Sequence, residues 1–508
     1  MRPPLCHRRI PIHLWRWWLA LTPALVVLLI TLAGIDQGDF RTDSHVYAAV
    51  TLKMVESGDW LHPMLGDAPY HRKPPMAFWM VAPFIKAFGA HLWSVRLAMG
   101  IYAGLTASAV FLMLKEVVRL RVAMAAALVF ALTHEVFRYT HAYSLDLPLA
   151  LLVVLTAWGV VHAAGVRRGK PRSPWWVVLA GVPMGASLMV KPGAALLLVP
   201  VLAVWLVSVR RWRLTPWLGA LLVFSVLIAL PWHLLMIRDY PAGSPMPFLD
   251  TYFGAETIQR FQGGDIVVRS PVWYYPQQFG ETYWPWLIGL VGALVWMAWR
   301  RRPVTGSWAG DGLGLAWGGI WLGVLSLLAG KSMRYVVPAY PGLSLLVAGF
   351  IVRVLPRGKR RLGRLIPFTI APVLALLVAL VIVSGVRLHP PPPEYRAELF
   401  AYLDQYGGDS TAGWPPLWIA PDQHRTAAHI YLERGVYPRL ARSPNSPLGG
   451  EPSVGDLMLY RMHDPAIPLE QRGWYAPRPG DAVLAHFGLW TVTRIDSPWT
   501  GRYTTRDD

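Results

Sequence analysis

Residues 19–35 read LALTPALVVLLITLAGI and residues 365–384 read LIPFTIAPVLALLVALVIVS, and neither stretch contains a charged side chain. A third stretch of this kind, LPLALLVVLTAWGVV, occupies residues 147–161. A helix that crosses a bilayer needs about 20 mostly apolar residues, whereas a helix of a soluble protein is apolar on one face only. Together with a hydrophobic fraction of 54% over 508 residues, these runs predict an α-helical polytopic membrane protein.

Similar apolar runs recur along the chain and predict about 11 transmembrane helices. We expect them at residues 17–35, 93–114, 122–137, 146–165, 174–190, 192–209, 215–237, 284–299, 313–330, 335–355 and 365–387. The first run follows a basic N-terminus, but it is longer than the apolar part of a signal peptide and no small-residue cleavage site follows it. An uncleaved first helix is therefore expected.

The basic residues are distributed as a membrane topology requires. Lys and Arg number 48 against 29 Asp and Glu, which gives a formal net charge of +19. If the predicted helices alternate in direction, the most basic connections fall on one side, at residues 8–16, 115–121, 167–172, 210–213, 300–302 and 357–364. Basic loops mark the cytoplasmic side, so no nucleic-acid partner is needed to explain the charge. The single Cys6 excludes a disulfide framework and a cysteine metal cluster.

Three longer segments fall on the other side of the predicted membrane. Two are the loops 36–92 and 238–283 of a transmembrane domain that we expect to span residues 1–388. The third is an extracytoplasmic C-terminal domain, residues 389–508, which opens with four consecutive prolines. Alternating apolar residues in LMLYRM and AVLAHFGLWTVTRI predict strands there. We therefore expect a small α/β domain at the C-terminus.

Acidic and basic side chains gather on this outer side. They include Asp36, Asp39, Asp43, His71, Arg72, Lys73, Asp146, Lys191, Lys331 and Arg334. A carboxylate can take a proton from an attacking hydroxyl, and cations can stabilise the charge on a departing phosphate. Ordinary structural roles compete with this interpretation, because Lys and Arg reach toward the interface and Asp caps helices. For Asp146, which precedes an apolar run, capping is a serious competitor.

Several sequence blocks carry a resemblance to a known family. They are DSHVY at 43–47, GDWLHP at 58–63, YHRKPPMAFW at 70–79, SLDLPLAL at 144–151, MVKPGAALLLVP at 189–200, PWH at 231–233, YFGAETIQRFQGGD at 252–265, SPVWYYPQQFGETYWPW at 270–286 and AGKSMRYVVPAYPGLSLL at 329–346. In this order and spacing the chain resembles the C-type (GT-C) membrane glycosyltransferases of the bacterial aminoarabinose transferase and protein O-mannosyltransferase family. No single block is decisive, and the likeness covers residues 36 to about 350.

The resemblance implies an inverting transfer of a sugar from polyprenyl phosphate, in a bacterium undecaprenyl phosphate. It assigns Asp43 as the general base or acceptor-orienting group, and Asp146 as a second acidic position. We expect Asp43 to take the acceptor proton by way of His45, for which an ordinary interface histidine is the alternative. The resemblance places Lys73, Lys331, Arg334 and Tyr335 at the donor phosphate, where Arg72 and Lys191 are also expected. The family often has Asp-Glu where this chain has Asp43-Ser44, which puts a second loop carboxylate and any metal depending on it in doubt.

The second outer loop offers candidate acceptor or lid residues. Glu256 and Arg260 are four apart, so on a helix they share a face, either as a surface ion pair or as part of a lid. Tyr274 and Tyr275 suit stacking on a sugar or an aromatic belt at the interface. No metal-ligand set is visible, and no cofactor is expected, although a divalent cation at the carboxylates stays open.

The sequence thus predicts a glycosyltransferase of the bacterial inner membrane with its active site facing the periplasm. The expected partners are the lipid-phosphate sugar donor, membrane lipids and an acceptor that is lipid A, a protein or an envelope glycan; a monomer is expected. A transporter or flippase of lipid-linked sugars is the main alternative, although no carboxylate lies in the middle of a predicted span. A non-catalytic assembly or sensing protein is a third reading.

Overall fold

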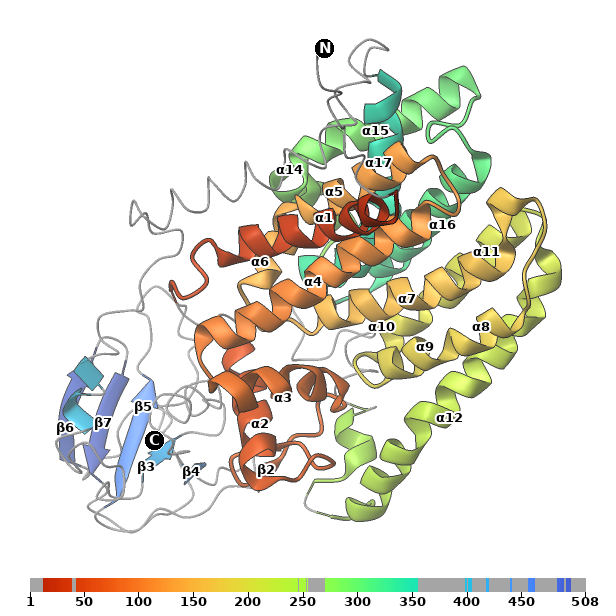
Figure 1. The fold of residues 1–508 in the computed structure, drawn as a ribbon. Helices are drawn as coiled ribbons and strands as arrows, with labels where there is room; N and C mark the ends of the chain where they lie inside the picture. Colours follow the sequence, from red (N-terminus) through yellow and green to blue (C-terminus); the bar gives the residue numbers. More distant parts are fainter. Residues whose placement is uncertain are drawn as a thin grey trace, which may run out of the picture.

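The computed structural model describes residues 12–38, 43–244, 246–252, 254 and 270–354, with short pieces at 398–399, 401–403, 417–419, 439–440, 456–461, 482–487 and 490–494 (Figure 1). The helices are α1 (Ile12–Leu32), α2 (Ser44–Ser57), α3 (Met76–Phe88), α4 (Leu92–Leu114), α5 (Leu120–Ala131), α6 (His134–Thr140), α7 (Asp146–Ala164), α8 (Trp175–Leu179), α9 (Gly181–Leu188), α10 (Pro192–Leu196), α11 (Leu198–Ser208), α12 (Thr215–Asp239), α14 (Tyr274–Thr282), α15 (Trp284–Arg300), α16 (Trp308–Leu327) and α17 (Tyr340–Val354). A 3₁₀ helix, η4 (Met333–Ala339), precedes α17.

Every predicted span up to residue 355 falls on a helix or a broken helix, and the last one, 365–387, lies outside the described residues. Among the described residues, four helical stretches are long and apolar enough to cross a membrane: Leu92–Leu114, Asp146–Arg168, Trp212–Asp239 and Met333–Val354. Two bent pairs, α5 with α6 at 53° and α14 with α15 at 119°, raise that number to six if each pair is one span. The helical class is confirmed, and the count of eleven stays a prediction.

The sharp bend before α15 has a local cause. Pro285 occupies the first turn of α15, where its missing N–H group costs no hydrogen bond. The same ring would clash inside a continuous helix. Accordingly α14 ends at Thr282, and a new helix starts at Trp284 in a different direction.

Small residues let the helices pack closely. A Cβ on Gly104 of α4 would lie 3.2 Å from the carbonyl oxygen of Ala24 on α1, and one on Gly342 of α17 would lie 2.6 Å from the Cβ of Trp317 on α16. Larger residues at either glycine would push the helices apart, as expected where helices associate through small residues in a bilayer. The α1 and α4 helices consequently lie side by side along their length (Figure 1).

Two buried tryptophans of α16 fix the 3₁₀ helix η4. The indole N–H of Trp317 donates to the Pro338 carbonyl at 2.8 Å, and that of Trp321 donates to the Tyr335 carbonyl at 3.0 Å. A 3₁₀ helix leaves carbonyl groups that need partners, and buried indole N–H groups need acceptors. These bonds hold the backbone of η4, which carries Arg334 and Tyr335, against α16.

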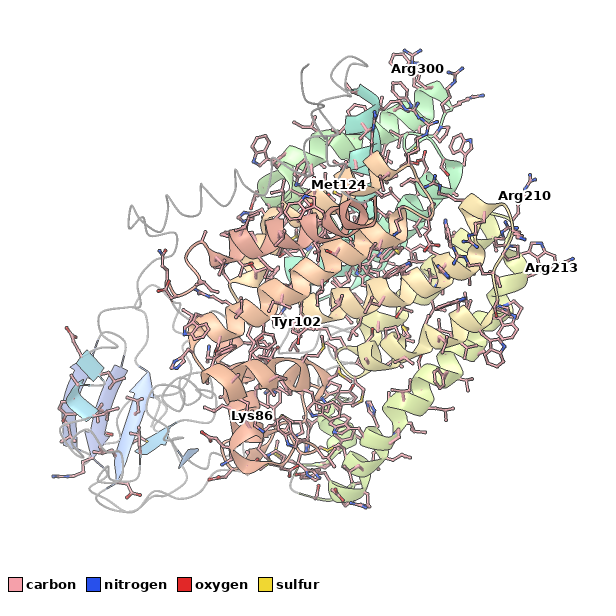
Figure 2. All side chains as sticks on the ribbon, in the orientation of Figure 1. Lys86, Tyr102, Met124, Arg210, Arg213 and Arg300 are labelled. Carbon is pink, nitrogen blue, oxygen red and sulfur yellow. The ribbon has the colours of Figure 1, made fainter. Side chains whose placement is uncertain are left out.

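The first outer loop folds onto one end of the bundle. It contains α2, the short antiparallel pair β1 (Met64–Leu65) and β2 (Ala68–Pro69), and α3, whose Phe78, Val81 and Ile85 are buried. Arg210, Arg213 and Arg300 lie at the end of the bundle away from α2 and α3 (Figure 2). The predicted separation of the long loop from these basic connections is therefore present in the fold.

The C-terminal part contains the strands expected from sequence. Strands β3 (Leu417–Ile419), β4 (Arg439–Leu440), β5 (Leu457–Arg461), β6 (Ala482–Phe487) and β7 (Trp490–Arg494) form a sheet in the order β4-β3-β5-β7-β6. β3 is parallel to β4 and β5, whereas β5, β7 and β6 are antiparallel neighbours. The division into domains at residues 388 and 389 stays a prediction.

Candidate active site

A cavity collects residues from distant parts of the chain. It is partly open to solvent and is lined by Tyr47, Lys73, Tyr139, Ala142, Tyr143, Ser144, Leu145, Asp146, Lys191 and Arg334. These residues come from α2, the loop before α3, the end of α6 and the turn after it, the start of α7, the residue before α10, and η4. Three cations and one carboxylate therefore face a single space.

Asp146 and Lys191 form the closest ion pair at this cavity. Lys191 Nζ lies 2.6 Å from Asp146 Oδ1, and the Asp146 side chain is only 3% exposed. Asp146 is the first residue of α7, but its carboxylate makes no capping hydrogen bond, so capping does not account for it. The carboxylate thus lies beside both the Lys191 ammonium and the positive end of the α7 dipole.

Asp43 is paired with a residue that is distant in sequence. Arg334 Nη1 lies 3.3 Å from Asp43 Oδ2, a contact across 291 residues of sequence. Asp43 precedes α2 in the capping position, yet its side chain makes no capping bond there. The Nε atom of Arg334 is buried and has no hydrogen-bond partner in the described part of the chain. A guanidinium with an unused N–H at a cavity wall is suited to an incoming phosphate oxygen.

Tyr335 and Tyr47 complete the surroundings of these charges. The Lys191 ammonium lies 4.8 Å, and the Arg334 guanidinium 5.5 Å, from the centre of the Tyr335 ring. Such cation–π contacts fix the position of a cation without neutralising it. Burial raises the pKa of Tyr47 well above its usual value, so its hydroxyl stays protonated and can donate a hydrogen bond.

Ser44 connects the two acidic segments. Its hydroxyl, fully buried, accepts a hydrogen bond of 3.0 Å from the backbone N–H of Tyr143, three residues before Asp146. The Tyr143 hydroxyl in turn lies 2.9 Å from Thr51 Oγ1 on α2. The residue that departs from the common family pattern is thus used to join the chain beside Asp43 to the chain beside Asp146.

Lys73 lines the cavity, whereas the two residues before it, His71 and Arg72, do not. Arg72 is exposed, and His71 is buried with its ring 4.4 Å from that of Tyr240 and 5.6 Å from that of Phe248. Burial lowers the pKa of His71 to about 4, so the imidazole is neutral at pH 7. His71 therefore packs the loop, and of this triplet Lys73 is the residue at the cavity.

The remaining predicted residues lie around the cavity or outside the described chain. Lys331 donates to the carbonyls of Ser270 and Leu328, at 2.8 and 2.5 Å. The buried Tyr275 contacts the backbone of Ser332 through its hydroxyl, half-buried Tyr274 packs edge-on against it, and His45 lies in the first turn of α2. Glu256 and Arg260 lie outside the described residues. The roles assigned to all of these residues stay predictions.

No group of three or more His, Cys, Asp or Glu side chains that could hold a metal ion occurs among the residues that the structure describes. Asp43 and Asp146 are each engaged by a cation instead. The expectation that no cofactor is needed stays a prediction.

Sequence reasoning missed the aromatic walls of the site. Tyr47, Tyr139 and Tyr143 all line the cavity, yet none was singled out. Tyr47 follows Asp43 by four residues, a spacing that puts both on one helical face and offered a usable signal. Tyr139, near the end of α6, and Tyr143, in the turn after it, carry no such signal, because their place at the cavity depends on how α6 meets α7.

Comparison with known proteins shows which families and proteins this chain resembles. The family model described as dolichyl-phosphate-mannose-protein mannosyltransferase matches residues 72–234. The undecaprenyl phosphate-alpha-4-amino-4-deoxy-L-arabinose arabinosyl transferase 1 of Sodalis glossinidius is 32% identical over 66% of this chain and 58% of its own length. The transferase of the same description in Pseudomonas aeruginosa (strain LESB58) is 29% identical over 76% of this chain and 70% of its own length.

Solved structures share the fold. The crystal structure of ArnT from Cupriavidus metallidurans bound to undecaprenyl phosphate has a TM-score of 0.68 at 18% identity and covers 96% of this chain and 100% of that one. The archaeal oligosaccharyltransferase AglB from Archaeoglobus fulgidus has a TM-score of 0.56 at 12% identity, covering 86% of this chain and 66% of that one. At these identities the likeness establishes the fold, which is that of the GT-C membrane glycosyltransferases.

Together, the family-model match, the curated relatives and the structural neighbours support the predicted GT-C aminoarabinose transferase-like family. The matched region spans less than two thirds of the length of the first curated relatives, 58% for the Sodalis protein and 56% for that of Edwardsiella ictaluri.

Proposed function

We propose that this protein is an inverting glycosyltransferase that moves a sugar from a polyprenyl-phosphate carrier to an acceptor hydroxyl. The acceptor oxygen attacks the anomeric carbon, the bond from that carbon to the phosphate oxygen breaks, and polyprenyl phosphate leaves with the bonding electrons. The observation that carries the proposal is the convergence of Asp43–Arg334 and Asp146–Lys191 with Lys73 around one cavity.

The cations account for the leaving group. A polyprenyl chain stays in the bilayer, so its phosphate arrives at the interface, and Lys73, Lys191 and Arg334 all face the cavity there. The unused Nε–H of Arg334 supplies a directed donor to a phosphate oxygen. Stabilisation of charge that develops on the phosphate lowers the barrier to breaking the sugar–phosphate bond.

The pairing of Asp43 with Arg334 couples donor binding to the availability of the base. Without a donor, Arg334 contacts the Asp43 carboxylate as well as the Tyr335 ring. When Arg334 turns toward a phosphate, its pairing with Asp43 weakens and the carboxylate becomes available to the acceptor hydroxyl. In this proposal Asp43 takes the acceptor proton after the donor has bound, and Asp146 holds Lys191 in place.

We further propose that the donor carrier is undecaprenyl phosphate in a bacterial inner membrane and that the cavity faces the periplasm. The names of the curated relatives, which specify undecaprenyl phosphate and 4-amino-4-deoxy-L-arabinose, support an amino-sugar donor and an envelope acceptor such as lipid A. A protein hydroxyl is the acceptor class suggested by the description of the matching family model.

The decisive experiment uses the full chain purified into nanodiscs with a synthetic undecaprenyl-phosphate sugar. We expect release of undecaprenyl phosphate and a mass gain on the acceptor, measured by liquid chromatography and mass spectrometry. Lys73→Ala is expected to weaken donor binding, since it removes one cation from the cavity. Chelation with EDTA is expected to leave turnover unchanged. Movement of intact donor across liposome membranes without cleavage would contradict the proposal in favour of a flippase.

Sidedness is tested separately. In a Cys6→Ser background, single cysteines replacing Asp43 or Lys73 should react with a membrane-impermeant maleimide added to intact spheroplasts. Cysteines replacing Arg213 or Arg300 should react only after lysis, since both lie at the other end of the bundle (Figure 2). Labelling with the opposite pattern would place the cavity on the cytoplasmic side of the membrane and exclude the proposed periplasmic location.

A further inference from the structure

One arginine is buried inside the helical bundle close to the cavity but is not part of its wall. Arg96 lies in the second turn of α4 and is 1% exposed. Its guanidinium donates to four backbone carbonyls: Gly34 at 3.2 Å, Ile35 at 3.0 Å, Gln37 at 2.6 Å and His141 at 3.1 Å. The side chain therefore joins two backbone segments that are more than a hundred residues apart in sequence.

Both segments lead directly into the acidic residues of the site. Residues 34–37 form the turn after α1, six residues before Asp43, and His141 is in the turn that leads to Asp146. Arg96 thus contacts the backbone upstream of each carboxylate. The Ser44–Tyr143 hydrogen bond joins the same two segments closer to the cavity.

His141 adds a second link of the same kind. Its Nε2 atom lies 3.0 Å from the carbonyl oxygen of Ala33, and its Nδ1 atom lies 3.1 Å from that of Phe137. Burial lowers the pKa of His141. We call Arg96 and His141, which both bind the backbone at residues 33–37, the turn clamp.

An arginine in this position needs a specific reason. Charged side chains are rare and costly within membrane helices, and a hydrophobic residue would pack α4 without that cost. The guanidinium is a planar group with five N–H donors in a fixed fork, whereas a lysine ammonium cannot span the same set of carbonyls. Four carbonyls on two segments use this geometry, so Arg96 fixes one segment relative to the other.

We propose that Arg96, with His141, is a positioning residue of the active site that sets the placement of the Asp43 segment relative to the Asp146 segment. The proposal rests on the proposed sugar transfer. Arg96 touches neither donor nor acceptor in it. Loss of the turn clamp is expected to slow the chemical step, because a misplacement of about 1 Å can cost a hundredfold in rate, while donor affinity is retained through Lys73 and Lys191.

The test compares Arg96→Lys with Arg211→Lys in the undecaprenyl-phosphate release assay. Arg211 is a matched control, because it also donates to two carbonyls, Ala164 at 3.0 Å and Gly169 at 2.7 Å, but at the other end of α7. Arg96→Lys is expected to lower kcat at least tenfold with donor KM within twofold of wild type. The acid limb of its kcat/KM–pH profile should move to higher pH, since in the donor-free enzyme a displaced Asp43 loses its contact with Arg334. Arg211→Lys should leave kcat, KM and the profile unchanged.

A distance measurement makes the test independent of turnover. Spin labels at Ser57, at the end of α2, and at Arg138, on α6, occupy exposed positions on the helices next in sequence to the two segments that the turn clamp joins. In a Cys6→Ser background we expect Arg96→Lys to shift or broaden this distance distribution and Arg211→Lys to leave it unchanged. If wild type released no undecaprenyl phosphate while the distances changed as expected, the sugar-transfer proposal would fail and the positioning role would stand.

Two results would overturn the positioning role. One is a folded Arg96→Lys protein with wild-type kcat, pH profile and label distances. The other is a loss of kcat in both arginine variants in proportion to their melting temperatures, which marks a general stability effect. If Arg96→Lys does not fold, His141→Leu removes the second link alone, and a folded His141→Leu protein with wild-type kcat and distances would equally overturn it.

Discussion

The two ends of α7 both carry charged clusters, and they differ in how those charges are used. At one end, Asp146 and Lys191 face a cavity together with Arg334 and Lys73. At the other end, Glu116 accepts hydrogen bonds from Trp158 at 3.2 Å and from His162 at 2.9 Å, and Arg172 lies 3.7 Å from the same carboxylate. Arg172 also contacts His162 directly.

The difference lies in what borders the charged groups. Three side chains converge on Glu116, and the Trp176 ring packs edge-on against His162 at 4.7 Å. Arg334, which contacts Asp43 at 3.3 Å, lines the cavity together with Asp146 and Lys191. Both clusters contain an arginine whose buried Nε has no partner in the described residues, Arg172 and Arg334. Burial, charge and an unused N–H group therefore do not identify a site by themselves; their position beside a cavity does.

The largest expected effect is the difference in turnover between a variant of Asp43 and a variant of Glu116. Asp43→Asn should reduce release of undecaprenyl phosphate by about a hundredfold or more, the usual contribution of a general base. Glu116→Gln should leave turnover within about twofold and lower only the melting temperature, because it loses ionic hydrogen bonds away from the cavity. Equal losses of turnover in the two variants, at equal protein yield, would remove the distinction between the clusters.

Breaking the Asp146–Lys191 pair should affect both stability and activity. Lys191→Met leaves a carboxylate that is 3% exposed without its cation, a change that typically costs about 3–5 kcal/mol for a buried pair. The melting temperature should fall, and donor KM should rise about tenfold, a loss of about 1.4 kcal/mol of binding.

The double variant Asp146→Asn with Lys191→Met separates these two effects. It should recover much of the melting temperature, since no unpaired charge remains, yet it should not recover donor affinity. Recovery of both properties would mean that the pair has only a structural function, like the Glu116 cluster.

Ser44 allows a finer comparison between a hydrogen bond at the site and one elsewhere. Ser44→Ala removes the bond to the Tyr143 N–H and should cost about 1 kcal/mol of stability with a several-fold loss of kcat. Ser225, buried and bonded to Leu221 and Gly181 carbonyls, is the control. Ser225→Ala should lower the melting temperature with kcat unchanged, as chemical denaturation and turnover assays can measure. A Ser44→Ala protein with full kcat would show that the Ser44–Tyr143 hydrogen bond does not contribute to turnover.

The smallest expected effect is the pH dependence of stability that His62 gives to the loop outside the cavity. His62 lies 2.8 Å from Asp59 and 3.0 Å from Asp239. Burial lowers the pKa of His62, but the hydrogen bonds to Asp239 and Asp59 outweigh burial and raise it above 6.5. A raised folded-state pKa means that this bridge stabilises fully below about pH 6.5 and less as pH rises through the folded-state value.

The measurement is the difference in melting temperature between wild type and His62→Gln from pH 5 to pH 8. The difference should be largest at low pH and shrink toward pH 8, with kcat changed little because His62 does not line the cavity. A difference that grows with pH would show that the charged bridge is not what stabilises this loop.

The sequence predicts the helices well and the pairings poorly, for a physical reason. Apolar runs such as residues 93–114 and 146–165 have nearly the same bounds as α4 and α7, because the requirement to fill a bilayer is local. The contact of Arg334 with Asp43 depends on where η4 lies against α16, which is set by Trp317 and Trp321. No local pattern encodes that arrangement.

The same limit applies to individual site residues. Lys73, Lys191, Asp146 and Arg334 were named from outer-side position and family likeness, and all four line the cavity. Lys331 was named on the same grounds; its ammonium donates to two backbone carbonyls, and its role at the phosphate stays a prediction. The sequence alone does not distinguish a cation that lines the cavity from one that binds the backbone, because both contacts depend on the tertiary structure.

The burial of Arg96 also has a consequence for biogenesis. During synthesis α4 enters the membrane with an arginine near its end, and three of the four acceptors, at residues 34, 35 and 37, are already present after α1. The fourth, His141, emerges 45 residues later. Pairing of α1 with α4 should therefore be the first tertiary event at the translocon, and removing Arg96 should make α4 insertion less dependent on α1.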